Sequence, residues 1–424
     1  MRLDTLGEKG FALPLVIMIT TIIMLLGTAF LTLAGTEESI AQNQVAQTQA
    51  LFIADAGVEK ALHVLDKKPL DKSVTEWMSE NQGELANIAV GGGTANVSIQ
   101  DKGSLIEITS QGQKGNAVKT LIAKAAPPAF EFGLAGGNGS STLEFTGNGN
   151  IEADIAYDGN VSIGSNSRTV TAHKVVVTGD FTVNGTLEAE HESADPPVDI
   201  LHVGGKVSAG KDNDIQGNWQ YDVGGSISPV GAIEGVAADL GEPYVPPPPD
   251  VDLSWYFQHK DLSAADPNDA AVVAKLATEP SGPEILYFSG NLTIQSQHGH
   301  DPIEFKGVRV LVVDGDVEVK DKLVPFDDDG DGKDDDGNAL LILATGNVDL
   351  TPAGGADKSR NLIVISEGMI TMSGNVDVEG AVWGATINSN GCAEFEYDED
   401  MVELIRDTGL VKEYSYRLVS WQEQ

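Results

Sequence analysis

The residue types best suited to chemistry lie in an acidic loop over residues 327–338, with the sequence DDDGDGKDDDGN. Aspartates at alternate positions, followed by Gly332, form a D-x-D-x-D-G-x-x-D pattern. Calcium takes about six to eight oxygen ligands in a flexible cage, and a tight loop can place alternate carboxylates on one side. Lys333 would contribute its backbone carbonyl, so its charge does not exclude the ion. The pattern predicts a calcium site formed by Asp327, Asp329, Asp331, Lys333 and Asp335; the alternative is a solvated acidic turn.

The acidic loop differs from an EF-hand in two respects. Asn338 occupies the twelfth position, where an EF-hand carries a bidentate Glu, and no helix is expected on either side. The loop is instead similar to the short calcium loops of pilus-tip adhesins and thrombospondin-like repeats. That resemblance favours calcium over an empty acidic turn.

A second candidate metal site is the H-x-H-D sequence of His298, His300 and Asp301. On a strand, side chains two residues apart share a face, so the two histidines could hold a transition metal together. No distant third ligand is evident in the sequence. We therefore favour a surface loop for these residues.

The sequence contains no motif of a common catalytic site. It lacks a nucleophile elbow, an H-E-x-x-H sequence and a C-x-x-C sequence. Aromatic residues make up 6% of the chain and bases number only 26, which argues against an anionic sugar substrate. We expect a protein that is not an enzyme. A membrane-anchored β-helix that acts on or binds a polysaccharide is the alternative.

The charge of the chain excludes one class of partner. The 424 residues include 64 acids and 26 bases, so the formal net charge is −38. The excess of acids is spread along the chain and does not form one acidic tail. The negative electrostatic field of such a chain repels nucleic acid and attracts cations, so we expect no nucleic-acid partner.

An apolar run of 23 residues without a charge extends from Phe11 to Leu33. At a rise of about 1.5 Å per residue, a helix of this length spans a bilayer core of roughly 30 Å. A secretory signal peptide has a shorter apolar region followed by a small-residue cleavage site, and this sequence has neither. The run predicts a transmembrane helix over residues 11–35, and a plain signal anchor is the alternative.

The start of this run resembles the class III leader of type IV pilins and pseudopilins. A charged leader, residues 1–10, ends in Lys9-Gly10 and is followed at once by Phe11. The resemblance implies that a prepilin peptidase cuts between Gly10 and Phe11 and that Phe11 is then N-methylated. It also implies a single-pass inner-membrane subunit that later packs with other pilin subunits in an extracellular filament. Most pilins carry Glu at the fifth mature position, where this chain has Leu15, and this difference favours a minor, tip-proximal subunit.

Residues 36–68 continue the helix with an amphipathic pattern. Apolar or small residues recur at helical spacing at Ile40, Val45, Ala50, Leu51, Ala54, Val58, Leu62 and Leu65. The stretch with Ala54, Ala56, Gly57, Glu59, Ala61 and Leu62 resembles that of PilX-type minor pilins. Residues 69–128 then alternate in strand fashion and predict three antiparallel strands packed on the helix, as in a pilin head.

The segment 129–397 repeats a short phrase of Gly, a polar residue and an apolar residue. The glycines are Gly159, Gly179, Gly205, Gly225, Gly290, Gly315, Gly346 and Gly374. Most are 20 to 31 residues apart, with one gap of 65 that holds an insertion over residues 228–283. A period of this length with β-branched residues and Gly/Asn/Asp turns predicts a right-handed parallel β-helix, with a β-sandwich as the alternative. In the insertion, Trp255, Tyr256 and Phe257 are expected to pack on the solenoid.

Together these patterns predict an α+β protein with a C-terminal tail over residues 398–424. We expect a minor, tip-proximal type IV pilus subunit involved in pilus assembly and surface adhesion, with a surface or glycan as the target of the head. The same leader would serve a type II secretion pseudopilin, which is the alternative within the family.

Overall fold

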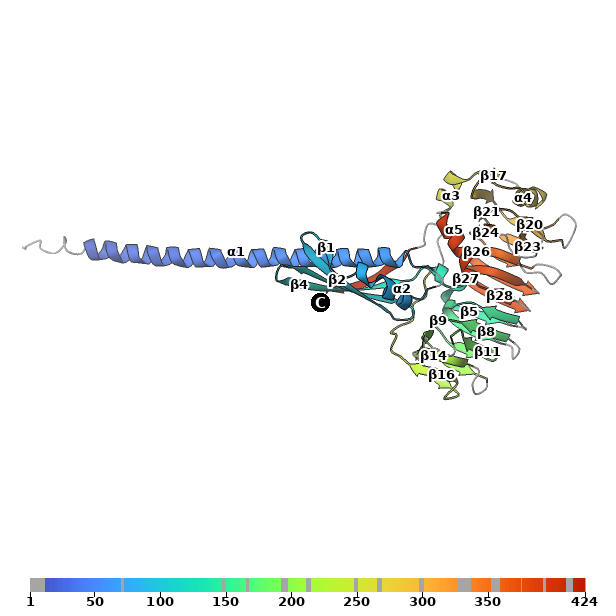
Figure 1. Ribbon diagram of the computed structural model, residues 1–424, viewed down its shortest axis with the longest axis horizontal. Helices are drawn as coiled ribbons and strands as arrows, with labels where there is room; N and C mark the ends of the chain where they lie inside the picture. The colour runs from blue at the N-terminus through green and yellow to red at the C-terminus, as the bar shows by residue number, and fades with distance from the viewer. Residues whose placement is uncertain are drawn as a thin grey trace, which may run out of the picture.

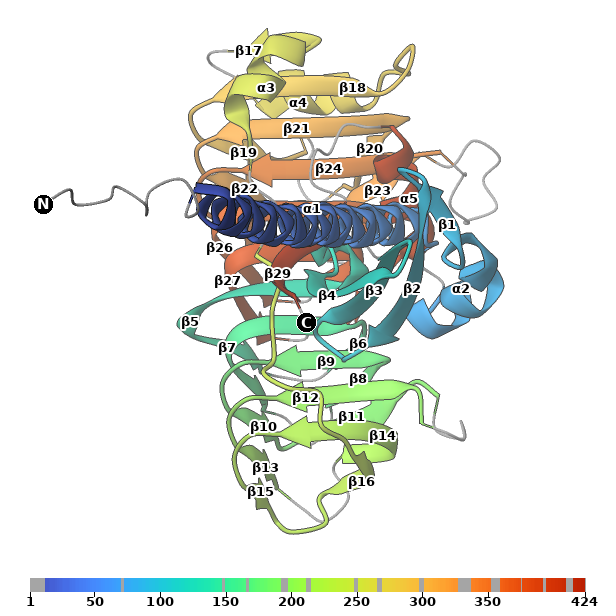
Figure 2. The ribbon, with the colours of Figure 1, turned by 90° about the vertical axis from the view of Figure 1, so that its left-hand side faces the viewer.

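The computed structural model describes most of the chain, and the fold is described for these residues: 12–69, 72–146, 149–164, 168–191, 197–210, 215–247, 251–264, 269–296, 301–326, 337–351, 359–374, 376–391, 394–408 and 415–423. Figure 1 shows a long helix, α1, that projects as a rod from a small sheet, with a larger β domain across the far end. Seen along the rod in Figure 2, the β domain extends to both sides of α1.

Helix α1 (Ala12–Leu65) is continuous over 54 residues. Its second half carries a buried stripe at helical spacing, Ala50, Ile53, Ala54, Val58, Ala61, Val64 and Leu65, which packs on the small sheet. Two residues of the predicted apolar face, Ile40 and Val45, are exposed, because the sheet covers only the last turns of the helix. The amphipathic prediction is therefore confirmed from Ala50 onward.

The small sheet contains five strands among the described residues, in the order β1-β2-β3-β4-β29. β1 (Ile88–Val90), β2 (Gly93–Asp101), β3 (Ile106–Lys114) and β4 (Ala117–Ala126) are antiparallel neighbours. β29 (Arg417–Glu423), from the other end of the chain, pairs antiparallel with β4. The small sheet thus has more strands than the three predicted, and residues 417–423 of the predicted tail belong to it. Helix α2 (Val74–Asn81) begins at a capping box between Ser73 and Glu76.

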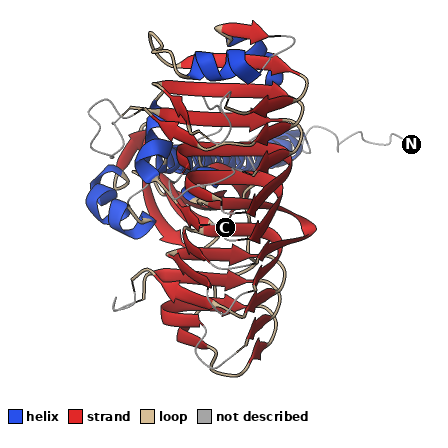
Figure 3. Ribbon diagram, turned by 90° about the vertical axis from the view of Figure 1, so that its right-hand side faces the viewer, coloured by secondary structure: helices blue, strands red, loops and turns tan. Residues whose placement is uncertain are grey.

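The larger domain is a parallel β-solenoid whose strands stack coil upon coil, as Figure 3 shows in red. After the short η2 (Ala129–Glu131), its first arm contains β5 (Leu134–Phe145), β6 (Gly149–Glu152), β7 (Ile155–Ile163), β8 (Arg168–Ala172), β9 (Lys174–Val177), β10 (Phe181–Val183), β11 (Thr186–Ala189), β12 (Asp199–Val203), β13 (Val207–Ala209), β14 (Ile215–Val223), β15 (Ile227–Ser228) and β16 (Ile233–Ala237). Parallel pairs such as β7 with β9 place the inward apolar residues of successive coils on one another.

The second arm begins with two short helices at the opposite end of the solenoid. It contains α3 (Leu253–His259), β17 (Leu262–Ala264), α4 (Asp269–Leu276), β18 (Glu284–Ser289), β19 (Leu292–Ile294), β20 (Ile303–Phe305), β21 (Val308–Asp314), β22 (Val317–Val319), β23 (Leu323–Pro325), β24 (Ala339–Ala344), β25 (Val348–Leu350), β26 (Ser359–Gly374), β27 (Asp377–Gly391) and β28 (Glu394–Glu396), and it is followed by α5 (Glu399–Asp407). Tyr256 is buried and, with Trp255, packs against the core that includes Tyr287, as predicted. Phe257 touches Tyr287 at its edge but is 53% exposed, so the packing prediction is confirmed for Trp255 and Tyr256 only.

The two arms meet in the middle of the solenoid. β27 pairs in parallel with β5, with Val382 opposite Leu134, and β28 pairs with β6. The chain therefore enters the solenoid at its centre, winds to one end and crosses to the other end. It then winds back until its last coils lie on its first. The gap of 65 residues holds this return connection, so residues 228–283 are not an insertion into one continuous winding.

The repeated Gly phrase forms a ladder of side-chain hydrogen bonds at one corner of the coils. Asn160 Oδ1 accepts from Asp180 N at 2.8 Å, and Asp180 Oδ1 accepts from Lys206 N at 2.8 Å. In the second arm, the same arrangement runs from Asn291 through Asp316 and Asn347 to Met369 N. A Cβ at Gly179 would lie 2.4 Å from Asn160 Oδ1 and 2.6 Å from Gly159 O, so the corner requires glycine. The last hydrogen bond of this ladder is made next to Gly368, whereas the sequence repeat had predicted Gly374.

Candidate functional site

Most residues predicted to be functional lie outside the described part of the chain. These are Gly10 and Phe11 of the cleavage site, residues 327–336 of the acidic loop, and His298 and His300. Asp301 is described and exposed, and Asn338 is described at the end of the acidic loop. The calcium ligand set and the H-x-H-D site stay predictions from the sequence.

The first half of α1 exposes apolar side chains on every side. Fourteen large hydrophobic side chains between residues 13 and 33 are each at least 45% exposed: Leu13, Leu15, Val16, Ile17, Met18, Ile19, Ile22, Ile23, Met24, Leu25, Leu26, Phe30, Leu31 and Leu33. Among the described residues, α1 is the one helix long and apolar enough to cross a membrane, by length and composition. A helix that is apolar all round requires lipid or other apolar helices around it.

Small residues interrupt the large side chains on this part of α1. A Cβ added at Gly27 or Gly35 would meet no atom within 4 Å. Small residues allow two helix backbones to approach closely, so Gly27, Ala29, Ala34 and Gly35 offer contact points for a second helix. The exposed half of α1 is thus a candidate surface for helix–helix assembly.

Asn338 closes the base of the acidic loop. Its Nδ2 donates to Phe326 O at 3.2 Å, and its Oδ1 accepts from Gly307 N at 2.6 Å. Its own carbonyl accepts from Asn361 Nδ2 at 2.9 Å. The bond from Asn338 to Phe326 joins the two described ends of the loop, between β23 and β24.

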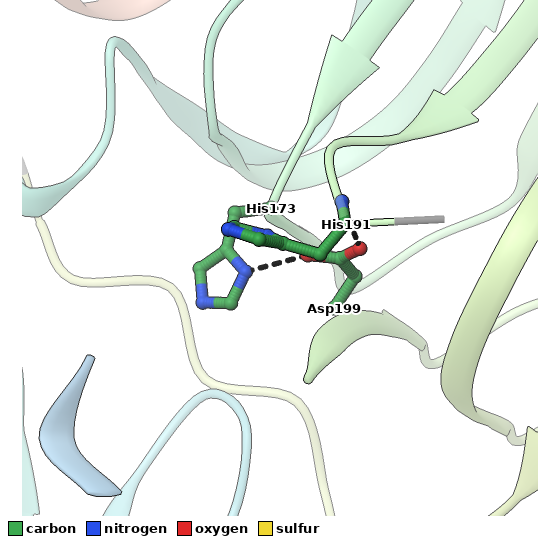
Figure 4. A group of neighbouring side chains, drawn as sticks. All are labelled: His173, His191 and Asp199. Atoms are coloured by element: carbon green, nitrogen blue, oxygen red, sulfur yellow. Dashed lines mark hydrogen bonds and ion pairs between the residues drawn. The ribbon is translucent and has the colours of Figure 1, made fainter. Parts of the chain in front are cut away.

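A cluster of two histidines and one aspartate lies in the first arm of the solenoid (Figure 4). His173 separates β8 from β9, His191 follows β11, and Asp199 is the first residue of β12. Asp199 Oδ1 lies 2.7 Å from His173 Nδ1 and 3.0 Å from His191 Nδ1. Asp199 Oδ2 accepts from His191 N at 2.7 Å.

Burial and hydrogen bonding act in opposite directions on the pKa values of Asp199 and His173. Burial alone would raise the pKa of Asp199, but the hydrogen bonds from His173 and His191 outweigh it and lower that pKa. Burial alone would lower the pKa of His173, but the hydrogen bond to Asp199 and the charge of Asp154 raise it. Asp154 itself accepts from His173 N and Lys174 N, and burial raises its pKa to about 6.

The cluster faces the small sheet and α2. Lys174 Nζ lies 3.7 Å from Asp101 Oδ2, at the end of β2. The charge of Glu76, in α2, interacts with His191 and His173. The region around the cluster therefore belongs to the junction between the small sheet and the solenoid.

Sequence reasoning missed this cluster because its three members do not match a common metal-ligand spacing. Asp199 is 26 residues from His173 and 8 from His191. The available signal was the spacing of 18 residues between His173 and His191, since it approaches the period of one coil and both follow a strand. A correct winding of the first arm would have placed the two histidines on adjacent coils.

Comparison with known proteins assigns the amino-terminal segment. Residues 9–59 match the family model "PilX N-terminal". Among solved structures, the crystal structure of competence-associated pilin ComZ from Thermus thermophilus is similar, with a TM-score of 0.35 and 12% sequence identity. The match covers 89% of this chain and 97% of that chain. An ice-binding protein from an Antarctic Flavobacteriaceae bacterium is 10% identical over 63% of this chain and 80% of that chain, with a TM-score of 0.20. No curated protein matches the sequence.

The family match covers the exposed half of α1 and continues into its packed half. At their TM-scores, the two solved structures do not define the fold of this chain. Residues 9–59, which include the exposed half of α1 and the start of its packed half, are thus similar to the amino-terminal segment of the PilX family.

Proposed function

We propose that this chain is a minor subunit of a type IV pilus, held by α1 in the inner membrane before assembly and in the filament afterwards. The observation that carries the proposal is the all-round apolar exposure of α1 within the segment that matches the PilX family. Lipid would cover this surface before assembly, and the helices of other pilin subunits would cover it in the fibre. The role is assembly and not catalysis.

The shape of the molecule supports a position at or near the tip. Neighbouring pilins would pack with their α1 helices side by side, which brings their heads close together. Figure 2 shows that the two arms of the solenoid extend to opposite sides of α1, beyond the small sheet. Many copies at adjacent positions would therefore collide, whereas one copy at the tip has open space above and around its solenoid.

The absence of a carboxylate at Leu15 supports the same position. A buried charge in an apolar helix core is costly without a partner, and a subunit with Leu at this position needs none. At the tip, the solenoid would be the first part of the fibre to touch a surface or glycan. We propose that the head contacts such a surface. We also propose that its coils are right-handed, because nearly all crossover connections between parallel strands have this hand.

We also propose calcium as a ligand of the acidic loop. The bond from Asn338 Nδ2 to Phe326 O brings the two ends of this acidic sequence together, as a short calcium-binding loop requires. Because the aspartates repel one another without an ion, calcium would stabilise the loop. Asp327, Asp329, Asp331, Asp335 and the carbonyl of Lys333 are the proposed ligands.

The position in the fibre is tested by locating the solenoid on isolated filaments. An epitope tag is placed at the carboxyl end of the chain, and fibres sheared from the cell surface are labelled with gold particles. We expect the chain in the sheared fraction and gold at fibre ends. Labelling along the whole fibre would contradict the tip position, and absence from the sheared fraction would contradict the pilus role.

A further inference from the structure

We propose that His173, His191 and Asp199 bind a divalent transition metal ion of the zinc class. One ring nitrogen from each histidine and one carboxylate oxygen all lie within 4.8 Å of one another. The three ligands come from two adjacent coils of the first arm, so an ion would link the corner after β8 to the corner between β11 and β12. Figure 4 shows both imidazoles directed toward the Asp199 carboxylate.

The donor set selects the class of ion. Two imidazole nitrogens with one carboxylate oxygen suit zinc and related first-row metals, whereas calcium and magnesium prefer oxygen ligands alone. The site therefore differs in chemistry from the acidic loop at residues 327–338. Three protein ligands leave one position of a tetrahedral ion open, and a water molecule or an external ligand would fill that position.

Two of the three ligands are already fixed in place. Asp199 is fully buried, and its second oxygen accepts a hydrogen bond from His191 N at 2.7 Å. The backbone of His173 is held by Asp154 Oδ1 at 2.8 Å. Outer partners of this kind orient the ligands of a metal before it binds.

The third ligand has room to adjust. A tetrahedral ion with bonds of about 2.0–2.2 Å separates its ligand atoms by roughly 3.3–3.5 Å. The present distances of 2.7 and 3.0 Å from Asp199 Oδ1 to the two nitrogens must therefore open slightly. The side chain of His191 is 51% exposed, so rotation of its ring can lengthen its distance to Asp199 and leaves the open position accessible to solvent. The distance between His173 and Asp199 must lengthen through a small rotation of the His173 ring, which is 23% exposed.

Neighbouring charges also favour a cation. Asp154 and Glu190 lie near the cluster on the solenoid side, and Glu76 interacts with both histidines from α2. Lys174 opposes them, but it is engaged with Asp101 at 3.7 Å. The local field adds to the net charge of −38 and would raise the local concentration of a divalent ion.

Zinc titration of the full chain in detergent micelles, after chelator treatment, tests this site. We expect one equivalent of zinc to bind at the cluster, and cobalt in its place to give the intense visible absorption of a four-coordinate ion. His173→Gln or His191→Gln should weaken zinc binding at least about 100-fold. His191→Gln separates a loss of metal binding from a loss of folding. The side chain of His191 is half-exposed, so this variant should fold normally and leave the circular dichroism spectrum unchanged.

Two controls separate this cluster from the other histidines. His259→Gln changes an exposed histidine in α3 and should leave zinc affinity as in the wild type. The double variant His298→Gln/His300→Gln should also keep the binding. The proposal is overturned if the wild type binds no zinc above the micelle blank. It is equally overturned if the double variant, and not His191→Gln, removes the binding.

Discussion

Gly112 of β3 lies so close to Ala54 of α1 that no other residue fits between the helix and the sheet. A Cβ at Gly112 would lie 2.4 Å from Ala54 N and 2.1 Å from Ala50 O, which are both backbone atoms. Gly57, one turn further along α1, is similarly close to Ser110 of β3. The small residues of the PilX-like stretch thus permit the close packing of α1 on the small sheet.

Replacing Gly112 with Ala should destabilise the head. The added methyl group would force the helix away from the sheet, and overpacking of this kind costs about 1–3 kcal/mol in the free energy of unfolding. Urea unfolding of the full chain in detergent, followed by circular dichroism, measures the change. Gly83→Ala is the matched control, because a Cβ there would meet no atom within 4 Å. Equal stability of the two variants would show that the helix–sheet contact is looser than described.

Replacing Gly35 with Leu should leave the stability of the subunit unchanged and impair assembly. A Cβ at Gly35 meets nothing within the subunit, so the stability of the isolated chain should stay within about 0.5 kcal/mol of wild type. In a fibre, the larger side chain would hold neighbouring helices apart and reduce the amount of chain in sheared filaments. Immunoblots of sheared and membrane fractions measure this amount, with Gly35→Ala as the milder control. Normal incorporation of the Leu variant would remove this face of α1 from the assembly surface.

The extent to which the sequence predicts this structure depends on the range of the interactions. The helix is predictable because the apolar run from Phe11 to Leu33 and the stripe from Ala50 onward are local patterns. The Gly phrase predicts a solenoid because each rung of the ladder repeats the same turn, as with Asn160 below Asp180. Repetition alone does not tell in which order the coils stack.

The remaining features depend on contacts between distant residues. The meeting of the two arms places Leu134 opposite Val382, and β29 joins the small sheet by pairing with β4. Neither pairing leaves a local pattern in the sequence. The same reason applies to Asp199, which comes close to His173 only because β12 stacks on β9.

Asp154 should make the stability of the solenoid fall as the pH rises from about 4 to 6. Burial raises its pKa from 3.8 in the unfolded chain to about 6 in the fold, so the native state holds a proton that the unfolded state releases. Its contribution is complete below the unfolded pKa and is lost as the pH rises through the folded pKa. The shift corresponds to at most about 3 kcal/mol.

The variant Asp154→Asn isolates this effect. Asn keeps an acceptor for His173 N and Lys174 N but does not titrate. The free energy of unfolding is measured in urea with chelator present. Between pH 4 and 6 it should fall more in the wild type than in the variant, so the difference between the two should change with pH. A difference independent of pH in this range would mean that Asp154 does not carry the proton.

Calcium should raise the melting temperature of the full chain through the acidic loop. An ion that binds the folded chain and not the unfolded chain adds roughly 2.7 kcal/mol to the free energy of unfolding at about 100 times its dissociation constant. The double variant Asp329→Asn/Asp331→Asn should remove the shift, whereas Asp400→Asn in α5 should retain it. Differential scanning calorimetry with calcium or chelator makes the comparison. No shift in the wild type at millimolar calcium would remove this site from the account.

The mass of the amino-terminal peptide, taken from the chain isolated from cells that contain a prepilin peptidase, tests the central claim most directly. The account predicts a chain that begins at Phe11 and carries a methyl group on its amino nitrogen. An intact Met1, or a cut beyond residue 30, would contradict the assignment of α1 as a processed pilin helix.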